Sequence, residues 1–401
     1  MQRGEERQPL HVVPVEVGDE RGAPEGLVAR ERLAPEAQPR AQVEHDGLAA
    51  GALQHDARGV APVAVVVRTR TGGRAPNPVE RHVEQRSPPF VLLPRDYRSA
   101  PIGGAQRPCH ARSVESRSLT VRGVELTFLE VGEGPLALCL HGFPDTAHTW
   151  RHLGPRLAEA GFHAVAPFNR GYAPSAVPAD GLHQTGALAA DANALHEALG
   201  GNDRAVLVGH DWGALAAYGA AGSGPDRWAR VVGMAVPPTS ATGLSLLSYE
   251  QVRRFWYAYF FLHPLAEMIV ARDDLAFVEG LWRDWSPGYD ASEDLGPVKR
   301  ALSGPANLTA ALGTYRATFG GGEQSPGLAD EQAACGEVPP QPTLYLHGDQ
   351  DGCVGVDVAR AAAPAFDREG CAFAVVPGTG HFLHLEAPGA VNDRIVAFLT
   401  G

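Results

Sequence analysis

The sequence predicts an α/β protein with a mostly parallel β-sheet that is flanked by helices and interrupted by a helical insertion. From residue 113 onward, short apolar runs alternate with helix-length segments, the pattern of successive βα units in a sheet covered on both faces. The alternation stops at residue 237, and residues 237–330 are rich in aromatic residues at helical spacing. We therefore expect a sheet domain built from residues 113–236 and 331–401, with residues 237–330 forming a helical cap.

The first part of the predicted sheet domain alternates strands with helices. The strands are short runs of β-branched and aliphatic residues, and the helices have apolar residues three and four positions apart. Strands are expected at Val124–Val131, Pro135–Leu140, His163–Phe168, Ala205–Val208 and Val231–Val236, and helices at Thr149–Ala160, Leu188–Leu199 and Trp212–Ala221.

The later elements follow from the same patterns. In the insertion, helices are expected at Tyr249–Phe261, Ala266–Glu279 and Gly304–Thr318. Afterwards, strands are expected at Pro342–Leu346 and Ala372–Val376, and a closing helix at Ala390–Leu399.

Residues 1–112 differ in composition from the rest of the chain. They contain only two aromatic residues, Phe90 and Tyr97, and 13 of the 33 prolines. Such a segment can bury too little apolar surface to offset the entropy lost on ordering. We expect a disordered extension or residues outside the natural protein, and a small folded domain is a further alternative. The second alternative arises because a single lysine, Lys299, against 33 arginines suggests a GC-rich gene, in which a start site is easily assigned too far upstream.

Composition excludes several classes of function. The net charge of −12 argues against nucleic-acid binding, which requires a basic surface. No apolar run approaches the 18 residues of a membrane span, and the N-terminus lacks the order of a secretory signal, so we expect a cytoplasmic protein without membrane partners. The five cysteines are widely spaced and form no CxxC pair, which predicts reduced thiols and no metal site.

The segment Gly209-His210-Asp211-Trp212-Gly213 joins a predicted strand to a predicted helix. It has the G-x-nucleophile-x-G form of a tight strand-to-helix turn that raises its central side chain above the sheet. An N-capping aspartate at an ordinary turn is the simpler alternative. A carboxylate at this position is already ionised, so Asp211 can attack an electrophilic carbon directly and form an alkyl ester. Hydrolysis of that ester then needs a general base and an oxyanion hole.

A base and an acid follow later strands in the order that this turn predicts. His381, in Gly380-His381-Phe382, follows the strand Ala372–Val376 and is the predicted base, with His384 as its competitor. The acid that orients the base should follow the strand Pro342–Leu346. Asp351 fits the spacing better than Asp349, which is the alternative as a turn-forming residue.

Two backbone N–H groups should form the oxyanion hole. One belongs to Trp212, directly after the nucleophile. The other is expected from Phe143, in the run His141-Gly142-Phe143-Pro144 after the second predicted strand. A cis bond at Pro144 would fix this loop.

Together these motifs resemble the soluble epoxide hydrolase branch of the α/β-hydrolase family. The resemblance covers roughly residues 114–401 and rests on His141-Gly142-Phe143-Pro144-Asp145, on the nucleophile turn and on Gly380-His381-Phe382. Asn169-Arg170-Gly171-Tyr172 is also similar to that branch, although it has Asn169 where Asp is usual and Ala173 where Gly is usual. The resemblance implies an α/β-hydrolase fold and no metal or organic cofactor.

The resemblance also implies two cap tyrosines that hydrogen-bond the epoxide oxygen and protonate it as the ring opens. The aromatic stretch ending at Pro264 matches the first at Tyr257, with Tyr259 as a rival. The pair Tyr315-Arg316 matches the second, and Tyr289 is a weaker rival to Tyr257. The expected reaction converts a small apolar epoxide and water into a vicinal diol through an ester of Asp211.

Four other functions compete with this hypothesis, and one of them is another hydrolase activity that uses the same Asp211 nucleophile. Haloalkane dehalogenases share the nucleophile and need N–H donors for a halide, which Trp212 with Trp256, Trp282 or Trp285 would supply. Fluoroacetate dehalogenases share the His-Gly-Phe-Pro run and a cap Tyr-Arg pair, but they have Arg where this chain has Trp212. Outside the enzymes, a small-molecule binding protein can use the same fold.

Overall fold

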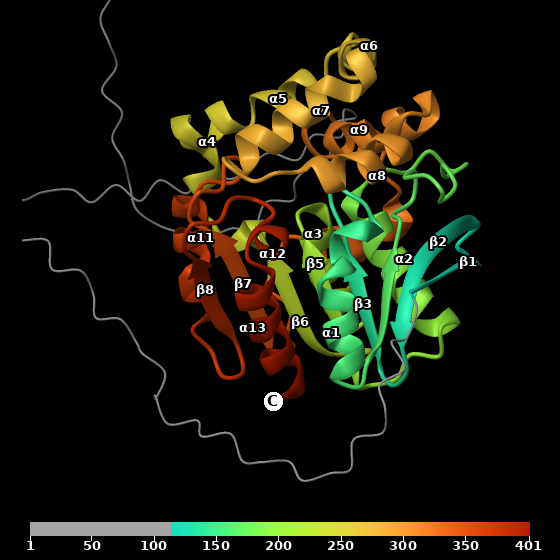
Figure 1. Ribbon diagram of the computed structural model, residues 1–401, viewed down its shortest axis with the longest axis vertical. Coiled ribbons are helices and arrows are strands. Elements are labelled where there is room, and N and C mark those ends of the chain that lie inside the picture. Colours follow the sequence, from blue (N-terminus) through green and yellow to red (C-terminus); the bar gives the residue numbers. More distant parts are fainter. Residues whose placement is uncertain (1–113) are drawn as a thin grey trace, which may run out of the picture. The chain divides into compact units, whose positions relative to one another are not determined.

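The computed structural model describes residues 114–401, so the expectations for residues 1–112 lie outside the described residues. The described chain contains an eight-stranded sheet with the strand order β1-β2-β4-β3-β5-β6-β7-β8 (Figure 1). Strand β2 runs antiparallel to β1 and β4, and the neighbours from β4 to β8 are all parallel. The predicted mostly parallel sheet is confirmed.

The central strands are buried on both faces, as their uninterrupted apolar runs require. Every residue of β3, β5 and β7 is buried, whereas the polar edge strand β1 is largely exposed. The strands are β1 (Glu115–Val121), β2 (Val124–Gly132), β3 (Leu136–Leu140), β4 (His163–Pro167), β5 (Ala205–His210), β6 (Trp228–Met234), β7 (Thr343–Gly348) and β8 (Ala372–Val376).

Two groups of helices flank the sheet. In the first group, α1 (Leu153–Glu159) packs against α13 (Pro388–Thr400), and the 3-10 helix η1 (Ala147–Arg151) leads into α1. In the second group, α2 (Thr185–Ala198), α3 (Trp212–Ser223) and α10 (Ala329–Ala334) pack against one another. The small residues of α3 permit this close packing, since a Cβ at Gly219 would lie 2.4 Å from Cys335 Sγ.

The chain between β6 and β7 forms the inserted helical segment, whose helices α4 to α9 lie together beyond one end of the sheet (Figure 1). The predicted helix Tyr249–Phe261 is two helices that meet at Phe255, where the backbone leaves helical geometry. The segment contains η2 (Thr239–Ala241), η3 (Ser245–Leu247), α4 (Tyr249–Arg254), α5 (Trp256–Phe260), α6 (Ala266–Val270), α7 (Arg272–Trp285), α8 (Ser292–Leu302), α9 (Pro305–Phe319) and η4 (Pro326–Leu328).

The connections after β7 and β8 complete the described chain. Between these strands lie α11 (Val356–Ala362) and η5 (Ala363–Phe366), and α12 (Leu383–Glu386) precedes α13. Within residues 114–401, no helix is long and apolar enough to cross a membrane.

Candidate active site

Asp211 lies at the turn between β5 and α3, in a backbone conformation that non-glycine residues rarely adopt. Its φ is 56° and its ψ is −123°, and its side chain is almost fully buried. Such a conformation persists only where the surrounding structure enforces it. The two flanking glycines show how it is enforced: a Cβ at Gly209 would lie 2.2 Å from Gly213 O, and one at Gly213 would lie 2.1 Å from Leu140 O. The predicted nucleophile turn therefore has the tight geometry that its sequence indicates.

The predicted base and acid meet Asp211 at the carboxyl ends of neighbouring strands. His381 Nε2 lies 3.6 Å from Asp211 Oδ2, and on the other side of the ring His381 Nδ1 lies 2.9 Å from Asp351 Oδ2. The backbone N–H of His381 also donates to the backbone carbonyl oxygen of Trp285 at 3.0 Å, which holds the His381 backbone in place. The three residues thus form a continuous carboxylate–imidazole–carboxylate arrangement.

Asp351 is held as an anion by the groups around it. Backbone N–H groups of Cys353 and Val354 donate to its Oδ1 at 2.7 and 2.9 Å. Burial opposes the charge, but the positive His381, its hydrogen bond to Asp351 and the nearby His347 outweigh burial and lower the pKa of Asp351. The anion can therefore orient the His381 ring and stabilise its protonated form.

The pKa of His381 is raised to about 10. Burial disfavours the imidazolium, but the charges of Asp351 and Asp211 and the hydrogen bond to Asp351 outweigh this cost. The charge state of Asp211 therefore decides how readily His381 accepts a proton.

The backbone N–H of Phe143, which was predicted to be an oxyanion-hole donor, points at the Asp211 carboxylate. This N–H donates to Asp211 Oδ1 at 2.8 Å. The other expected donor is Trp212, the first residue of α3, where a helix leaves its N–H groups without intrahelical partners. The Phe143–Pro144 bond is cis, as the motif suggested.

The loop carrying Phe143 is held by the Asn169-Arg170-Gly171-Tyr172 turn. The Asn169 side-chain amide donates to His141 O at 2.7 Å, and its backbone N–H donates to His141 Nε2 at 3.0 Å. An aspartate at position 169 could not donate the first of these bonds. Arg170 instead forms a buried ion pair with Asp191 on α2. Asn169 thus makes a contact with the loop that an aspartate could not make.

A cavity of about 220 Å³ lies between Asp211 and the inserted helical segment. Among the described residues that line it, Asp211 is the only one with a formal charge. Most of its other lining residues are apolar or aromatic, and the polar exceptions include Thr239 and Thr318. A larger cavity of about 320 Å³ lies between β2, β4 and α1 and is lined by none of the predicted site residues.

Tyr257 and Tyr315 both line the 220 Å³ cavity together with Asp211. Both are 2% exposed, and their ring centroids lie 5.7 Å apart. Burial, and the nearby negative charge of Asp211, raise the pKa of each phenol well above its ordinary value. The hydroxyl of Tyr315 has no hydrogen-bond partner among the described residues. Two protonated hydroxyls therefore line the space beside the carboxylate.

The rival residues lie elsewhere or are engaged in other contacts. Tyr259 is 44% exposed at the outer part of the cavity, and Tyr289 donates to Asp294 at 2.7 Å. Asp349 accepts from Gly378 N–H at 2.7 Å, the turn-forming role weighed for it. His384 Nε2 lies 2.6 Å from Thr149 Oγ1.

Two residues of the site make contacts that the sequence did not indicate, although Trp285 was weighed as a halide donor. Cys353 lines the cavity, and its Sγ lies 3.2 Å from the Tyr257 hydroxyl. Trp285, at the end of α7, packs its ring edge against His381 and accepts the His381 N–H at its carbonyl. Both contacts join segments far apart in the chain, so no local pattern could have indicated them.

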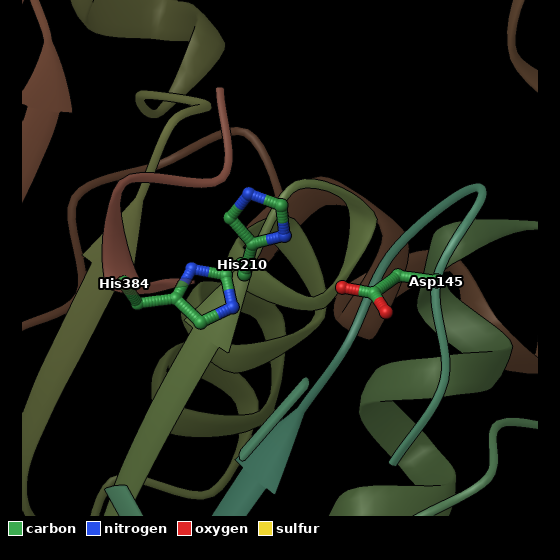
Figure 2. A group of neighbouring side chains, drawn as sticks. All are labelled: Asp145, His210 and His384. Atoms are coloured by element: carbon green, nitrogen blue, oxygen red, sulfur yellow. The ribbon is translucent and has the colours of Figure 1, made fainter. Parts of the chain in front are cut away.

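Two groups of described residues have donor atoms close enough to hold a metal ion. One is Asp211 with Cys353 and His381, whose donors already serve the site above. The other is Asp145 with His210 and His384, whose donors lie within 4.8 Å of one another (Figure 2).

The second group lies behind the His381 backbone. Figure 2 shows the two imidazole rings side by side with the Asp145 carboxylate facing them. His210 Nε2 lies 2.9 Å from the backbone carbonyl oxygen of His381, so the His210 ring donates to that carbonyl and helps to hold the His381 backbone in place. Burial raises the pKa of Asp145 to about 7 and lowers that of His210 to about 3, so near neutral pH His210 is neutral and Asp145 is only partly ionised.

Comparisons with known proteins agree with this geometry. The family model described as alpha/beta hydrolase fold matches residues 135–388. The chain is 31% identical to an epoxide hydrolase of Caballeronia sordidicola, over 71% of this chain and 94% of that protein. It is 30% identical to epoxide hydrolase A of Mycobacterium tuberculosis, over 71% of this chain and 97% of that protein.

A solved structure shows the same likeness. The crystal structure of epoxide hydrolase A from Mycobacterium thermoresistibile matches with a TM-score of 0.57 and 26% identity, over 72% of this chain and 99% of that chain. The sequence motifs, the strand order and these relatives agree: the chain belongs to the α/β-hydrolase family, in its epoxide hydrolase-like branch.

Proposed function

We propose that the protein hydrolyses epoxides to vicinal diols through a covalent ester on Asp211. The observation that carries the proposal is one cavity lined by a carboxylate, Asp211, and by the hydroxyls of Tyr257 and Tyr315. An epoxide needs both at once: a nucleophile at carbon, and an acid at the oxygen that becomes an alkoxide.

In the first step, Asp211 opens the ring. Its Oδ1 is bound by Phe143 N–H, which leaves Oδ2 to attack the less hindered or more activated epoxide carbon. The carbon–oxygen bond of the ring breaks, and a tyrosine transfers its proton to the departing oxygen while the other tyrosine donates a hydrogen bond. The product is a β-hydroxyalkyl ester of Asp211 and a tyrosinate.

In the second step, water hydrolyses the ester. Esterification removes the charge of Asp211, one of the two carboxylates that raise the pKa of His381. The pKa of His381 should therefore fall in the ester, so that the neutral ring can accept a proton from water. Hydroxide adds to the Asp211 carbonyl carbon, and the N–H groups of Phe143 and Trp212 bind the oxyanion. The bond between the carbonyl carbon and the alkyl oxygen then breaks, and His381 returns its proton to the departing alkoxide, which leaves as the diol. The Asp211 carboxyl group that remains gives its proton to the tyrosinate, which restores both side chains.

The surroundings of Arg316 disfavour a haloacid substrate. A carboxylate-bearing substrate would need a cation in the cavity, and among the described lining residues there is none. Arg316 instead forms an ion pair with Glu267 and donates to Phe261 O at 3.0 Å.

The tryptophans disfavour a haloalkane substrate. The indole N–H of Trp282 donates to Pro144 O at 2.9 Å, and Trp256 is half exposed. Trp285 does not line the described cavity. Trp212 is then the remaining candidate for halide binding, since its indole N–H has no partner among the described residues. One N–H donor and two phenols suit an alkoxide better than a halide.

The lining of the cavity supports an apolar substrate. Several apolar side chains at its outer part are also exposed to solvent, among them Leu247 at 69% and Phe319 at 38%. Continuous apolar surface from solvent to Asp211 favours substrates with an aryl or alkyl group and no charge. Water is the second substrate, no cofactor is invoked, and a cytoplasmic location stays part of the proposal.

A competition assay tests the reaction. The purified protein is given styrene oxide and 1-bromobutane together, and diol and bromide are quantified. We expect diol without bromide. In parallel, His381→Gln should accumulate the ester, adding one substrate mass to the peptide that contains Asp211, whereas Asp211→Ala should show no adduct.

Each other outcome rejects a part of the proposal. Bromide without diol would indicate a dehalogenase and leave the two tyrosines as packing residues. Diol formation with an unmodified Asp211 peptide in the His381→Gln protein would contradict the covalent mechanism. Ligand binding with neither product would favour the binding-protein alternative.

A further inference from the structure

Cys353 is a nucleophilic residue in the cavity that the proposed reaction does not use. It is 1% exposed and lies in the loop between β7 and α11, two residues after Asp351. Its side chain faces the same cavity as Asp211 and Tyr257. A buried thiol elsewhere in a core needs no explanation, but this one meets the hydroxyl that is proposed to protonate the epoxide.

Three contacts fix the position of Cys353. Its N–H donates to Asp351 Oδ1 at 2.7 Å, and its carbonyl accepts from the Gln251 side-chain amide of α4 at 2.9 Å. Its Sγ lies 3.2 Å from the Tyr257 hydroxyl, within the range of a sulfur hydrogen bond. The two backbone hydrogen bonds of Cys353 therefore hold its thiol next to the Tyr257 hydroxyl.

The direction of this hydrogen bond matters for ring opening. If Tyr257 donated to sulfur, its proton would be directed away from the substrate. If the thiol donates to the phenolic oxygen, the Tyr257 proton is free to face the cavity. Burial and the nearby charges of Asp351 and Asp211 raise the pKa of Cys353 well above its ordinary value, so the thiol retains the proton that it would donate.

We infer that Cys353 is a positioning residue for Tyr257: its S–H donates to the phenolic oxygen and leaves the Tyr257 O–H directed at the epoxide oxygen. The same S–H then donates to the tyrosinate that forms when the ring opens. The thiol gains and loses no proton in this scheme, and Cys353 acts only through Tyr257. The inference rests on the proposed function.

Rapid-mixing kinetics with the full chain separate the two chemical steps. Ester formation and ester hydrolysis are measured for the wild type, for Cys353→Ala and for Cys353→Ser with styrene oxide. Loss of one hydrogen bond should slow ester formation about 2- to 10-fold in Cys353→Ala. Cys353→Ser keeps a donor and should restore the wild-type rate. Ester hydrolysis should be unchanged in both, since the tyrosinate regains its proton only after the ester bond is broken.

The matched control removes another buried thiol. Cys335 lies next to α10, is 3% exposed and is not among the residues that line the cavity. Cys335→Ala should leave the rates of both steps unchanged. This control separates the loss of a thiol at Tyr257 from the general effect of a small cavity in the core.

A double-mutant cycle tests that Cys353 acts through Tyr257. In the Tyr257→Phe background, Cys353→Ala should slow ester formation no further, because the phenolic oxygen is gone. Multiplicative effects of the two substitutions would overturn the inference. So would a Cys353→Ala protein that slows ester hydrolysis as much as ester formation, because that result assigns Cys353 to the Asp351–His381 side.

Failure of the proposed function is distinguishable from failure of the inference. A wild type that forms no ester with the epoxide overturns both. A wild type that forms and hydrolyses the ester, with Cys353→Ala and Cys353→Ser opening the ring at the wild-type rate, overturns only the role of Cys353.

Discussion

The carboxylate of Asp211 lies against a backbone with no room for a side chain at residue 142. A Cβ at Gly142 would lie 2.2 Å from Asp211 Oδ1, so an alanine must displace the carboxylate or the loop that carries Phe143. Either movement breaks the 2.8 Å bond from Phe143 N–H. We expect Gly142→Ala to lower kcat about 100- to 1000-fold, the effect of losing one oxyanion donor.

Gly389 provides the matched control for this substitution. It lies exposed near the start of α13, and a Cβ there would meet no atom within 4 Å. Gly389→Ala should retain wild-type kcat and add up to about 1 kcal/mol of stability from helix propensity. Steady-state kinetics and urea unfolding of both variants check this. Wild-type kcat in folded Gly142→Ala would contradict the proposed position of the oxyanion hole.

Residues in local motifs were predictable, and residues that act through long-range contacts were not. Asp211 and Phe143 lie in short patterns whose glycines and strand ends carry the geometry, so the sequence alone indicated their places. The structure brings Tyr257 and Tyr315 to the same cavity, although only the family resemblance, and no spacing rule, selected them. The contacts of Cys353 with Tyr257 and of Trp285 with His381 were missed because the partners lie far apart in the chain.

At the scale of elements, helix α4 is joined to the loop after β7 by one side chain. The Gln251 amide donates to Cys353 O at 2.9 Å, and its carbonyl accepts from Gly355 N–H at 2.8 Å. Gln251→Leu leaves both backbone groups without these partners, at a cost of about 1–3 kcal/mol for each. Because the loop also carries Asp351, we expect slower ester hydrolysis in addition to lower stability.

Gln341→Leu separates these two effects. Gln341 is also buried, and its amide donates to Ala221 O and Pro225 O, each at 3.0 Å, before the start of β7. Gln341→Leu should lower the free energy of unfolding about as much as Gln251→Leu does, without changing the rate of either chemical step. Unfolding by urea and rapid-mixing kinetics measure the two effects. Equal rates of ester hydrolysis in the two variants would show that α4 does not hold the Asp351 loop in place.

The missed elements share a physical cause. Strand β1 is an exposed edge strand with mostly polar residues, so it has no apolar period to detect. Helix α8 contains Gly296 and Pro297, which favour a loop in any sequence-based prediction, yet its buried side is packed by Val298 and Leu302. Tertiary packing therefore stabilises these two elements although their local sequences do not favour them.

Helix α7 shows a different error. The sequence predicted one helix from Ala266 to Glu279, and the structure contains α6 followed by α7, which continues to Trp285. Residues 273–275 at the junction have a left-handed backbone, which no apolar period indicates. The extension positions Trp285, whose carbonyl accepts the N–H of His381.

At the scale of the whole molecule, strand order explains why distant motifs form one site. Parallel strands β3, β5, β7 and β8 end at the same edge of the sheet, so the loops that follow them bring Phe143, Asp211, Asp351 and His381 together. This convergence was predictable from the βα alternation. The placement of the inserted helical segment over that edge was not, because its packing depends on contacts between helices rather than on any repeating pattern.

Buried titratable groups make stability depend on pH. Burial lowers the pKa of His141 to about 4, that of His210 to about 3 and that of His384 well below its ordinary value. These folded-state values lie below the unfolded value of 6.5, so stability is lost as pH falls from 6.5 toward 4. Asp145 opposes the trend, because its pKa is raised from 3.8 to about 7 and its contribution is lost as pH rises through that range.

On the alkaline side, His381 has the opposite sign. Its folded-state pKa of about 10 exceeds the unfolded value of 6.5, so its contribution is complete below pH 6.5 and is lost as pH rises toward 10. The buried thiol of Cys353 acts in the same direction, since burial raises its pKa. Stability is thus lost toward acid pH, which we call the acid limb, and toward alkaline pH, which we call the alkaline limb. Together they predict a maximum of stability near neutral pH.

Urea unfolding between pH 4 and pH 10 measures this profile. All six tryptophans lie between residues 150 and 285, so their fluorescence reports on the described part of the chain. If unfolding takes up one proton fewer, the slope of the free energy of unfolding against pH changes by about 1.4 kcal/mol per pH unit. His210→Asn should flatten the acid limb by about that amount, and His381→Gln should flatten the alkaline limb while leaving the acid limb steep. If His381→Gln retained the wild-type decline between pH 7 and pH 10, the imidazolium would not be held by Asp211 and Asp351, and the proposed change in its basicity on esterification would lose its physical basis.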